Sequence, residues 1–247
     1  MGRQPRRPPG PALGEALAEH GLGLRQLTLS SCQPVAGLIN TGQTRAAQCP
    51  AFNAAVLDWL DRHPEITDVV LFATWNSFLF DRSGPDLTGH MRRDGFYSVP
   101  VDGPELAGDP AREAAFAAAL ADTLTRAAGD SRHVTLVAAL PRPDISVPRH
   151  FAAVLWRGAP CLDRAGWPRA HADALGDRAR AVFATAIAQT GLAPDRVQLI
   201  DPEQSFCDAA SCDLIRDGKL LYSDGNHPSL PGTALMLPPI VADILSR

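Results

Sequence analysis

Short apolar segments alternate with longer amphipathic ones along the chain, and this alternation constrains the fold more than any other feature. The runs DVVLFAT (68–74) and HVTLVAAL (133–140) are continuously apolar, as strands covered on both faces are. Between them, Phe116, Leu120 and Leu124 recur at the spacing of one helical face. Strands that alternate with helices predict an α/β domain with a mainly parallel sheet.

The remaining segments extend this pattern. A first helix is expected to end at Gly21, and LRQLTLS (24–30) is predicted to be the strand that follows it. Phe52, Val56 and Leu60 predict the buried face of a second helix. The last third of the chain predicts a helix over 173–191, a strand over 197–200 and a closing helix over 233–245, which Pro238 and Pro239 either kink or restart.

The size and charge of the chain exclude some classes of function. Its 247 residues, 45% of them hydrophobic, suffice for one domain with a sizeable core. The formal net charge of -4 argues against nucleic acid as a partner, because nucleic-acid binding needs a basic face. No apolar stretch approaches the roughly 18 residues that span a bilayer.

Export signals and cysteine usage point in different directions. The first residues are positively charged, but no apolar segment follows them as in a secretory signal. Yet four of the five cysteines form two close pairs, Cys32 with Cys49 and Cys207 with Cys212, and only Cys161 stands apart. Such pairs are compatible with disulfides in an oxidising compartment.

A candidate site lies near the end of the chain, where Asp224 and His227 stand three residues apart in the segment SDGNHPS. An acid and an imidazole are two of the three groups of a hydrolytic triad, in which the acid orients the imidazole and the imidazole activates a serine. The same segment is also rich in turn residues, so a simple turn is the alternative. In a parallel sheet, this loop would converge with the loops after residues 74 and 30.

A metal site is another interpretation of the same region. The potential ligands are Cys207, Asp208, Cys212, Asp213, Asp224 and His227. Zinc sites mostly use cysteines two to four residues apart with a matching second pair, which this segment lacks. A disulfide within CDAASC accounts for the cysteines better, and no metal or cofactor is expected.

Several blocks of the sequence resemble the SGNH domain of bacterial acyltransferases. The stretch GKLLYSDGNHPSLPG (218–232) matches the pattern G-x-x-L-Y-x-D-x-x-H-x-S-x-x-G of that family. Upstream, VVLFATW (69–75) and CQP (32–34) occur in the same order as in the family, with the paired cysteines before the last block. The resemblance covers the chain from Gly10 onward.

The resemblance implies a flavodoxin-like three-layer α/β/α domain over residues 12–247. It implies an O-acyltransferase or esterase that moves acyl groups, chiefly acetyl, to or from hydroxyls of cell-surface glycans such as lipopolysaccharide through an acyl-serine. Such domains are usually fused to a membrane acyltransferase domain, which would deliver the acyl donor, and they face the periplasm or cell exterior. A noncatalytic domain that binds a glycan or docks a partner is the alternative.

The resemblance also assigns roles to single residues. His227 matches the general base and Asp224 the acid of the family's D-x-x-H block. Asn76, after the tryptophan of FATWNSF, is a candidate oxyanion donor, with a cap or turn as the alternative. An extracytoplasmic domain could keep Cys207–Cys212 and Cys32–Cys49 oxidised, with Cys161 left free.

The nucleophile that this resemblance requires is missing. The family places a serine in a Gly-Asp-Ser-His block at the end of the first strand, and no such block occurs here. Counting back from the first helix puts Gln4 at the serine position, within an irregular segment, 1–11. With suitable codons, GRQPRR read from the second base gives Gly-Asp-Ser-His-Ala, so we expect a frameshift or misplaced start. The chain as written is then predicted to lack both the serine and the first strand, and to be inactive and poorly stable.

Overall fold

A parallel sheet of three strands forms the centre of the molecule, which we describe from a computed structural model. The strands are β2 (Asp68–Leu71), β6 (His133–Val137) and β8 (Val197–Ile200), hydrogen-bonded in the order β2-β6-β8. The structure describes residues 10–40, 46–75, 79, 84–85, 91–92, 98–101, 106, 108–143, 145–158 and 165–247. The chain is therefore a mixed α/β protein, as the alternating pattern predicts.

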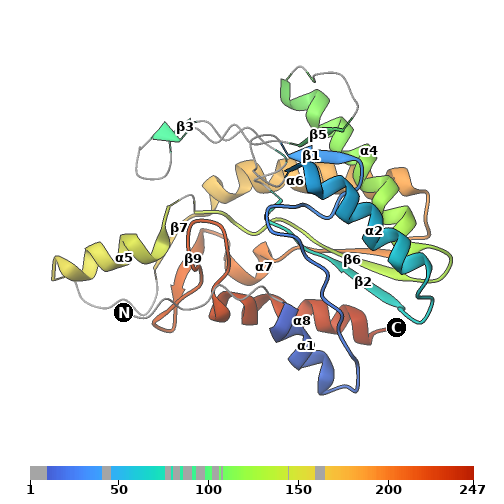
Figure 1. Cartoon of the computed structure of the whole chain (residues 1–247). Helices are drawn as coiled ribbons and strands as arrows, with labels where there is room; N and C mark the ends of the chain where they lie inside the picture. The colour runs from blue at the N-terminus through green and yellow to red at the C-terminus, as the bar shows by residue number, and fades with distance from the viewer. Residues whose placement is uncertain are drawn as a thin grey trace.

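Helices pack on both faces of this sheet (Figure 1). Val134 and Leu136 of β6 belong to the apolar cluster with three of the helices, whereas Val137 belongs to the cluster on the opposite face. On that opposite face, the hydroxyl of Thr135 donates to Asp243 at 2.6 Å. The first cluster involves α2 (Cys49–Asp61), α4 (Gly108–Ala128) and α6 (Arg169–Thr190), and the second involves α1 (Gly10–Ala18) and α8 (Leu230–Leu245).

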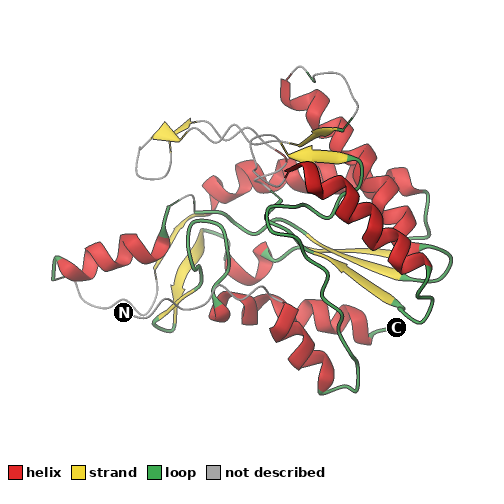
Figure 2. Cartoon of the chain, viewed as in Figure 1, coloured by secondary structure: helices red, strands yellow, loops and turns green. Residues whose placement is uncertain are grey.

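Short strands and helices complete the described structure (Figure 2). An antiparallel sheet of order β10-β9-β7 adjoins the second apolar cluster and leads directly into the Asp224 loop. The elements are β1 (Leu38–Asn40), β5 (Ser98–Pro100), β3 (Gly84–Pro85), β4 (Met91–Arg92), β7 (Ala165–Pro168), β9 (Ser211–Arg216), β10 (Lys219–Leu220), the 3-10 helix η1 (Ala46–Gln48), α5 (Val147–Trp156) and α7 (Glu203–Phe206).

Most of the predicted elements are present. Phe116, Leu120 and Leu124 are all buried in α4, as their spacing predicts. The helix predicted to end near residue 191 does so, with Gly191 in the left-handed conformation that ends many helices. The closing helix continues through Pro238 and Pro239 as one element, so these prolines do not restart it.

Two expectations were wrong, and a third was confirmed only in part. The predicted strand over 24–30 is absent, and residues 22–29 have no regular structure. The two faces of β2 pack against the two apolar clusters, as predicted, but its four residues are only half-buried, because β2 is an edge strand among the described strands. In α2, the buried residues are Cys49, Asn53, Leu57 and Leu60, whereas the expected Phe52 and Val56 are only partly buried.

Hydropathy separates these helices from membrane spans. In the part of the chain that the structure describes, no helix combines the length and the apolar character that crossing a bilayer requires.

Candidate active site

Asp224 and His227 form a hydrogen-bonded pair on the loop between β10 and α8. Nδ1 of the His227 ring lies 2.8 Å from Oδ2 of Asp224. The second carboxylate oxygen, Oδ1, accepts the backbone N–H groups of Asn226 at 2.9 Å and of His227 at 2.8 Å. The carboxylate is thus held by its own loop and fixes the orientation of the imidazole.

The charge of this pair follows from its hydrogen bonds. Burial by itself would raise the pKa of the Asp224 carboxyl group, but the hydrogen bonds from the His227 ring and the two backbone amides outweigh it and lower that pKa. The carboxylate is therefore ionised at neutral pH and only accepts hydrogen bonds. Nδ1 of His227 must carry the shared proton, which leaves Nε2 as the nitrogen that can act as a base.

Further backbone hydrogen bonds fix the loop against the helix that follows it. The N–H of Ser223 donates to the carbonyl of His227, and the N–H of Ser229 donates to the carbonyl of Leu221, both at 2.9 Å. The hydroxyl of Ser229 caps α8 by accepting the N–H of Gly232 at 3.1 Å. The loop is therefore closed at both ends by its own backbone.

A close approach of two backbones joins this loop to the start of α5. A Cβ atom on Gly225 would lie 2.9 Å from the carbonyl oxygen of Ile145, so this position favours glycine. The N–H of Val147 points to the carbonyl oxygen of Asp224 at 3.4 Å. The loop with the Asp–His pair and the N-terminus of α5 therefore pack as one unit.

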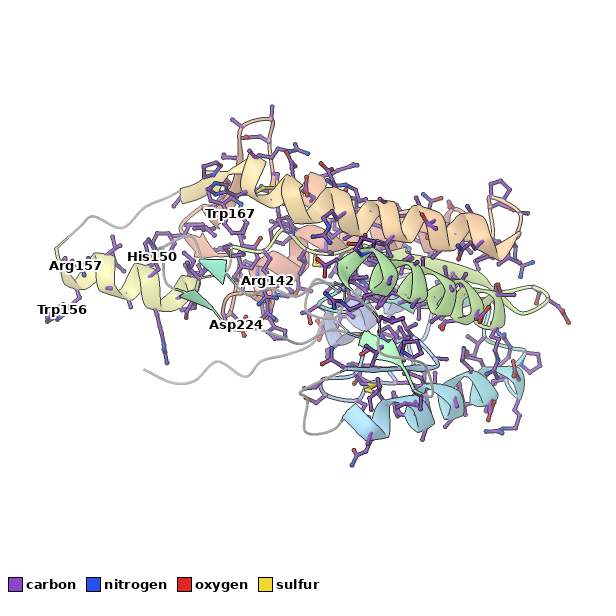
Figure 3. The ribbon with its side chains drawn as sticks, turned by 90° about the horizontal axis from the view of Figure 1, so that it is seen from above. Arg142, His150, Trp156, Arg157, Trp167 and Asp224 are labelled. Carbon is purple, nitrogen blue, oxygen red and sulfur yellow. A yellow bond between two sulfur atoms is a disulfide. The ribbon has the colours of Figure 1, made fainter. Side chains whose placement is uncertain are left out.

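A small pocket lies beside the pair at the carboxyl ends of the parallel strands. Thr74 and Trp75 follow β2, Ala139, Leu140 and Arg142 follow β6, and Asn226 comes from the Asp224 loop. Arg142 lies in the segment that leads to α5, and the carbonyl of Asp224 accepts from the N–H of Val147 at the start of that helix (Figure 3). The pocket is where a parallel α/β sheet usually holds its ligand.

Trp75 forms part of the pocket wall. Its side chain is fully buried, and its indole N–H donates to the carbonyl of Val137 at 2.7 Å. The ring also packs edge-on against Phe116 and Phe183. This tryptophan therefore connects the end of β2 to β6 and to the helical layer.

Both predicted disulfides are present. Cys207 is joined to Cys212 and Cys32 to Cys49. The first closes the turn between α7 and β9, and β9 leads through β10 to Asp224. Cys161 lies outside the described residues.

An ion-pair network supports this turn from the side of α6. Glu203 is 2% exposed and accepts from Arg169 and Arg180, both at 2.9 Å. Arg169 also donates to the backbone carbonyl of Asp208 at 2.9 Å. Burial of the Arg180 guanidinium favours its neutral form. Hydrogen bonds to Asp177 and Glu203 outweigh this effect and raise the pKa of Arg180, which therefore stays charged.

The remaining predicted site residues are not brought to the pair. Asn76 lies outside the described residues, and so does residue 4, where the serine was expected. Of the described residues that were expected to converge here, Ser31 and Cys32 do not line the pocket. Within the described part of the chain, no side-chain hydroxyl hydrogen-bonds to the ring of His227.

Comparison with known families agrees with this geometry. A family model described as the SGNH domain, fused to AT3 domains, matches residues 10–242. This chain belongs to that family. Comparison with curated proteins and with solved structures gave no significant match. The SGNH match includes every residue of the pocket and both members of the Asp–His pair.

Sequence reasoning missed several residues that line the site. Thr74 and Arg142 each stand at or just beyond the end of an apolar run that predicts a strand, which is the signal that could have placed them at the carboxyl edge of the sheet. Asn226 stands inside the D-x-x-H stretch, and its place in the pocket wall depends on the turn that Asp224 holds. Gly225 gave no signal, because a close approach to Ile145 across 80 residues depends on the tertiary fold.

Proposed function

We propose that this SGNH domain is an O-acyltransferase or esterase that transfers acyl groups, chiefly acetyl, to or from hydroxyls of cell-surface glycans. The observation that carries the proposal is the hydrogen bond between His227 Nδ1 and Asp224 Oδ2, which leaves Nε2 available as a base beside a pocket at the sheet edge. A membrane acyltransferase domain delivers the acyl donor, and a glycan is the acceptor. The two disulfides support a periplasmic or other extracytoplasmic location.

The proposed chemistry proceeds through an acyl-serine. Nε2 of His227 takes the proton of a serine hydroxyl while the serine oxygen attacks the acyl carbonyl, and the leaving group then receives that proton. In the second half, Nε2 takes the proton of the acceptor hydroxyl, whose oxygen attacks the carbonyl of the acyl-serine. The bond between the acyl group and the serine oxygen then breaks, and His227 returns the proton to that oxygen. Asp224 stabilises the imidazolium in both halves, and the amide of Asn76 is the proposed donor to the oxyanion.

The family's serine block is the part of this proposal that rests on the sequence alone. We propose a flavodoxin-like three-layer domain over residues 12–247 whose first strand ends in Gly-Asp-Ser-His and lies next to β2. Residues 1–11 are then the remnant of that segment in a shifted reading frame. The edge position of β2 among the described strands supports this arrangement. On this proposal we expect the chain as written to be inactive.

A noncatalytic SGNH-like domain is the second candidate, and one observation favours it. Among the described residues, no hydroxyl lies within hydrogen-bonding distance of the His227 ring, so nothing described there could serve as its nucleophile. In this case the pocket binds a glycan or docks a membrane partner, and the Asp–His pair has a structural role.

A chromogenic acetyl ester distinguishes the two candidates. We expect no turnover by the present chain and clear turnover by a chain extended upstream in the shifted frame. In the extended protein, His227→Ala should abolish turnover, whereas the control His133→Ala should not. His133 hydrogen-bonds the carbonyl of Asp195 at the opposite end of β6. An extended, folded protein without turnover would leave the noncatalytic candidate.

A further inference from the structure

Helix α5 extends from the body of the protein as a separate arm. Its first residues are anchored, because Val147 and Phe151 are buried in the apolar cluster that also contains α1 and α8. Beyond Phe151 the helix leaves the body, and two perpendicular views agree on this (Figures 1 and 3). The arm is about 15 Å long at 1.5 Å per residue.

The tip of this arm is apolar and exposed. Trp156 is 89% exposed, the highest value among the large hydrophobic side chains of the described residues, and the neighbouring Leu155 is 48% exposed. The other described tryptophans are sheltered: Trp75 and Trp167 are buried, and Trp59 is partly buried between Arg25 and His63. An indole held out at a convex tip is unlike the usual place of this residue in a soluble fold.

The charge of the arm is opposite to that of the whole chain. From Val147 to Gly158 it contains Arg149, His150 and Arg157 and no acidic residue, although the chain carries a net charge of -4. Arg149 and Arg157 are both exposed, and neither forms an ion pair with another described residue. The arm therefore presents one guanidinium group next to its apolar tip, on Arg157, and another about two helical turns back towards its base, on Arg149.

We propose that the tip of α5 docks this domain on an anionic lipid bilayer, with Trp156 and Leu155 inserted at the headgroup level and Arg149 and Arg157 on lipid phosphates. Tryptophan is enriched at that level of membranes, and arginine is attracted to anionic headgroups. A convex tip can enter a bilayer, whereas a glycan site is usually a concave surface with several converging polar groups. The insertion is shallow and the apolar area small, so the contact orients the domain rather than anchoring it alone.

The contact is independent of the catalytic proposal and would place the site at a defined height above the membrane. The N-terminus of α5 packs on the Asp224 loop through the approach of Gly225 to Ile145. Docking at the tip therefore holds the pocket about one helix length from the bilayer. At that height it faces ligands presented near the membrane surface.

Lipid vesicles test the proposal with Trp156 as the reporter. The full chain, with its fold checked by circular dichroism, is mixed with vesicles of phosphatidylcholine alone or with phosphatidylglycerol added. We expect a blue shift of tryptophan emission and co-sedimentation only with the phosphatidylglycerol vesicles, both reduced by added salt. Brominated lipids should quench this emission in the wild-type chain but not in Trp156→Ala.

Variants give the size of the effect. Trp156→Ala should weaken vesicle binding about tenfold or more, and each of Arg149→Glu and Arg157→Glu about fivefold or more. Leu245→Ala, a change of another exposed apolar side chain on a different helix, is the matched control and should bind as the wild type does. Because Trp156 is almost fully exposed, its replacement should leave the fold intact.

Three results would overturn the docking proposal. The first is vesicle binding that Trp156→Ala leaves unchanged, or no vesicle binding by a folded chain. The second is a Trp156 emission shift caused by an acidic polysaccharide without lipid, which would make the arm a glycan site. The third is a dimer in lipid-free solution that Trp156→Ala dissociates, which would assign the tip to a second copy of the chain.

Discussion

The hydroxyl of Tyr222 donates to the backbone carbonyl of Pro141 at 2.8 Å, although 81 residues separate the two in the chain. Tyr222 is 1% exposed, and burial raises the pKa of its phenol, which therefore stays protonated as a donor. Pro141 lies just after β6, next to the pocket residues Leu140 and Arg142. This hydrogen bond connects the Asp224 loop to the segment that follows the carboxyl end of β6.

Replacing Tyr222 with Phe should therefore disturb both stability and the site. The change leaves the Pro141 carbonyl without its buried donor, and we expect the free energy of unfolding to fall by about 1–2 kcal/mol. In the upstream-extended protein, ester turnover should fall because the loop that carries Asp224 and His227 loses this attachment. Urea unfolding and the ester assay measure the two effects. Unchanged values in both would mean that the hydrogen bond neither stabilises nor positions the loop.

The Asp224–His227 pair should also make the free energy of unfolding depend on pH. Its carboxyl pKa is lower in the folded protein than in the unfolded chain, where it is about 4, so folding favours the ionised form. The stabilisation from the ionised carboxylate is complete at pH values above the pKa of the unfolded chain. It is lost as the pH falls from that value towards the lower pKa of the folded protein. We expect urea midpoints of the wild type and Asp224→Asn to differ most at neutral pH and to converge below about pH 4. A gap that stays constant down to pH 3 would contradict this assignment.

Local patterns predicted the central layers of this fold well. Phe116, Leu120 and Leu124 mark the buried face of α4, and HVTLVAAL marks β6, because each depends on a periodicity that neighbouring residues set. The hydrogen bond between Asp224 and His227 could also be predicted, because their spacing in one turn lets the carboxylate reach both the ring and the turn amides.

The sequence could not predict features that depend on distant partners. The segment 24–30 has the apolar content of a strand but pairs with none of the described strands. β10 has only two residues, and β7 (AGWP) contains a glycine and a proline, which are rare inside strands, so neither gives a strand signal. The burial of Asn53 in α2 was equally hidden, since it depends on hydrogen bonds to the carbonyls of Gln33 and Val35.

Gly232 should tolerate no side chain. A Cβ atom there would lie 2.1 Å from the carbonyl oxygen of Leu221, in the loop that leads to Asp224. We expect Gly232→Ala to lower the free energy of unfolding by about 2 kcal/mol or more. Gly23→Ala is the matched control, because no atom lies within 4 Å of its Cβ position, and it should change stability by less than about 0.5 kcal/mol. Equal unfolding midpoints for the two variants would show that the loop can move away from α8.

The open edge of the parallel sheet leads to the last prediction. Of the strands that the structure describes, β2 pairs with β6 alone, and its four residues are half-buried. Leu24 and Leu27, in the segment that was expected to be a strand, are both 39% exposed, and Leu22 just before it is 41% exposed. An added strand beside β2 would hydrogen-bond the N–H and C=O groups of β2 that point away from β6. Its other side would give residues 24–30 a strand to pair with.

We expect a chain extended upstream in the shifted frame to supply that strand and with it the serine. The added strand should raise the free energy of unfolding, because it covers apolar surface and pairs backbone groups on both of its sides. It should also slow hydrogen exchange at the amides of β2 that point away from β6, and these amides should exchange fast in the present chain. Urea unfolding and exchange mass spectrometry compare the two proteins, and the 5′ coding region shows whether the codons exist. A gene with no Gly-Asp-Ser-His codons in any phase, or an extension that leaves β2 exchanging as before, would remove the missing-strand account and with it the reason to expect activity.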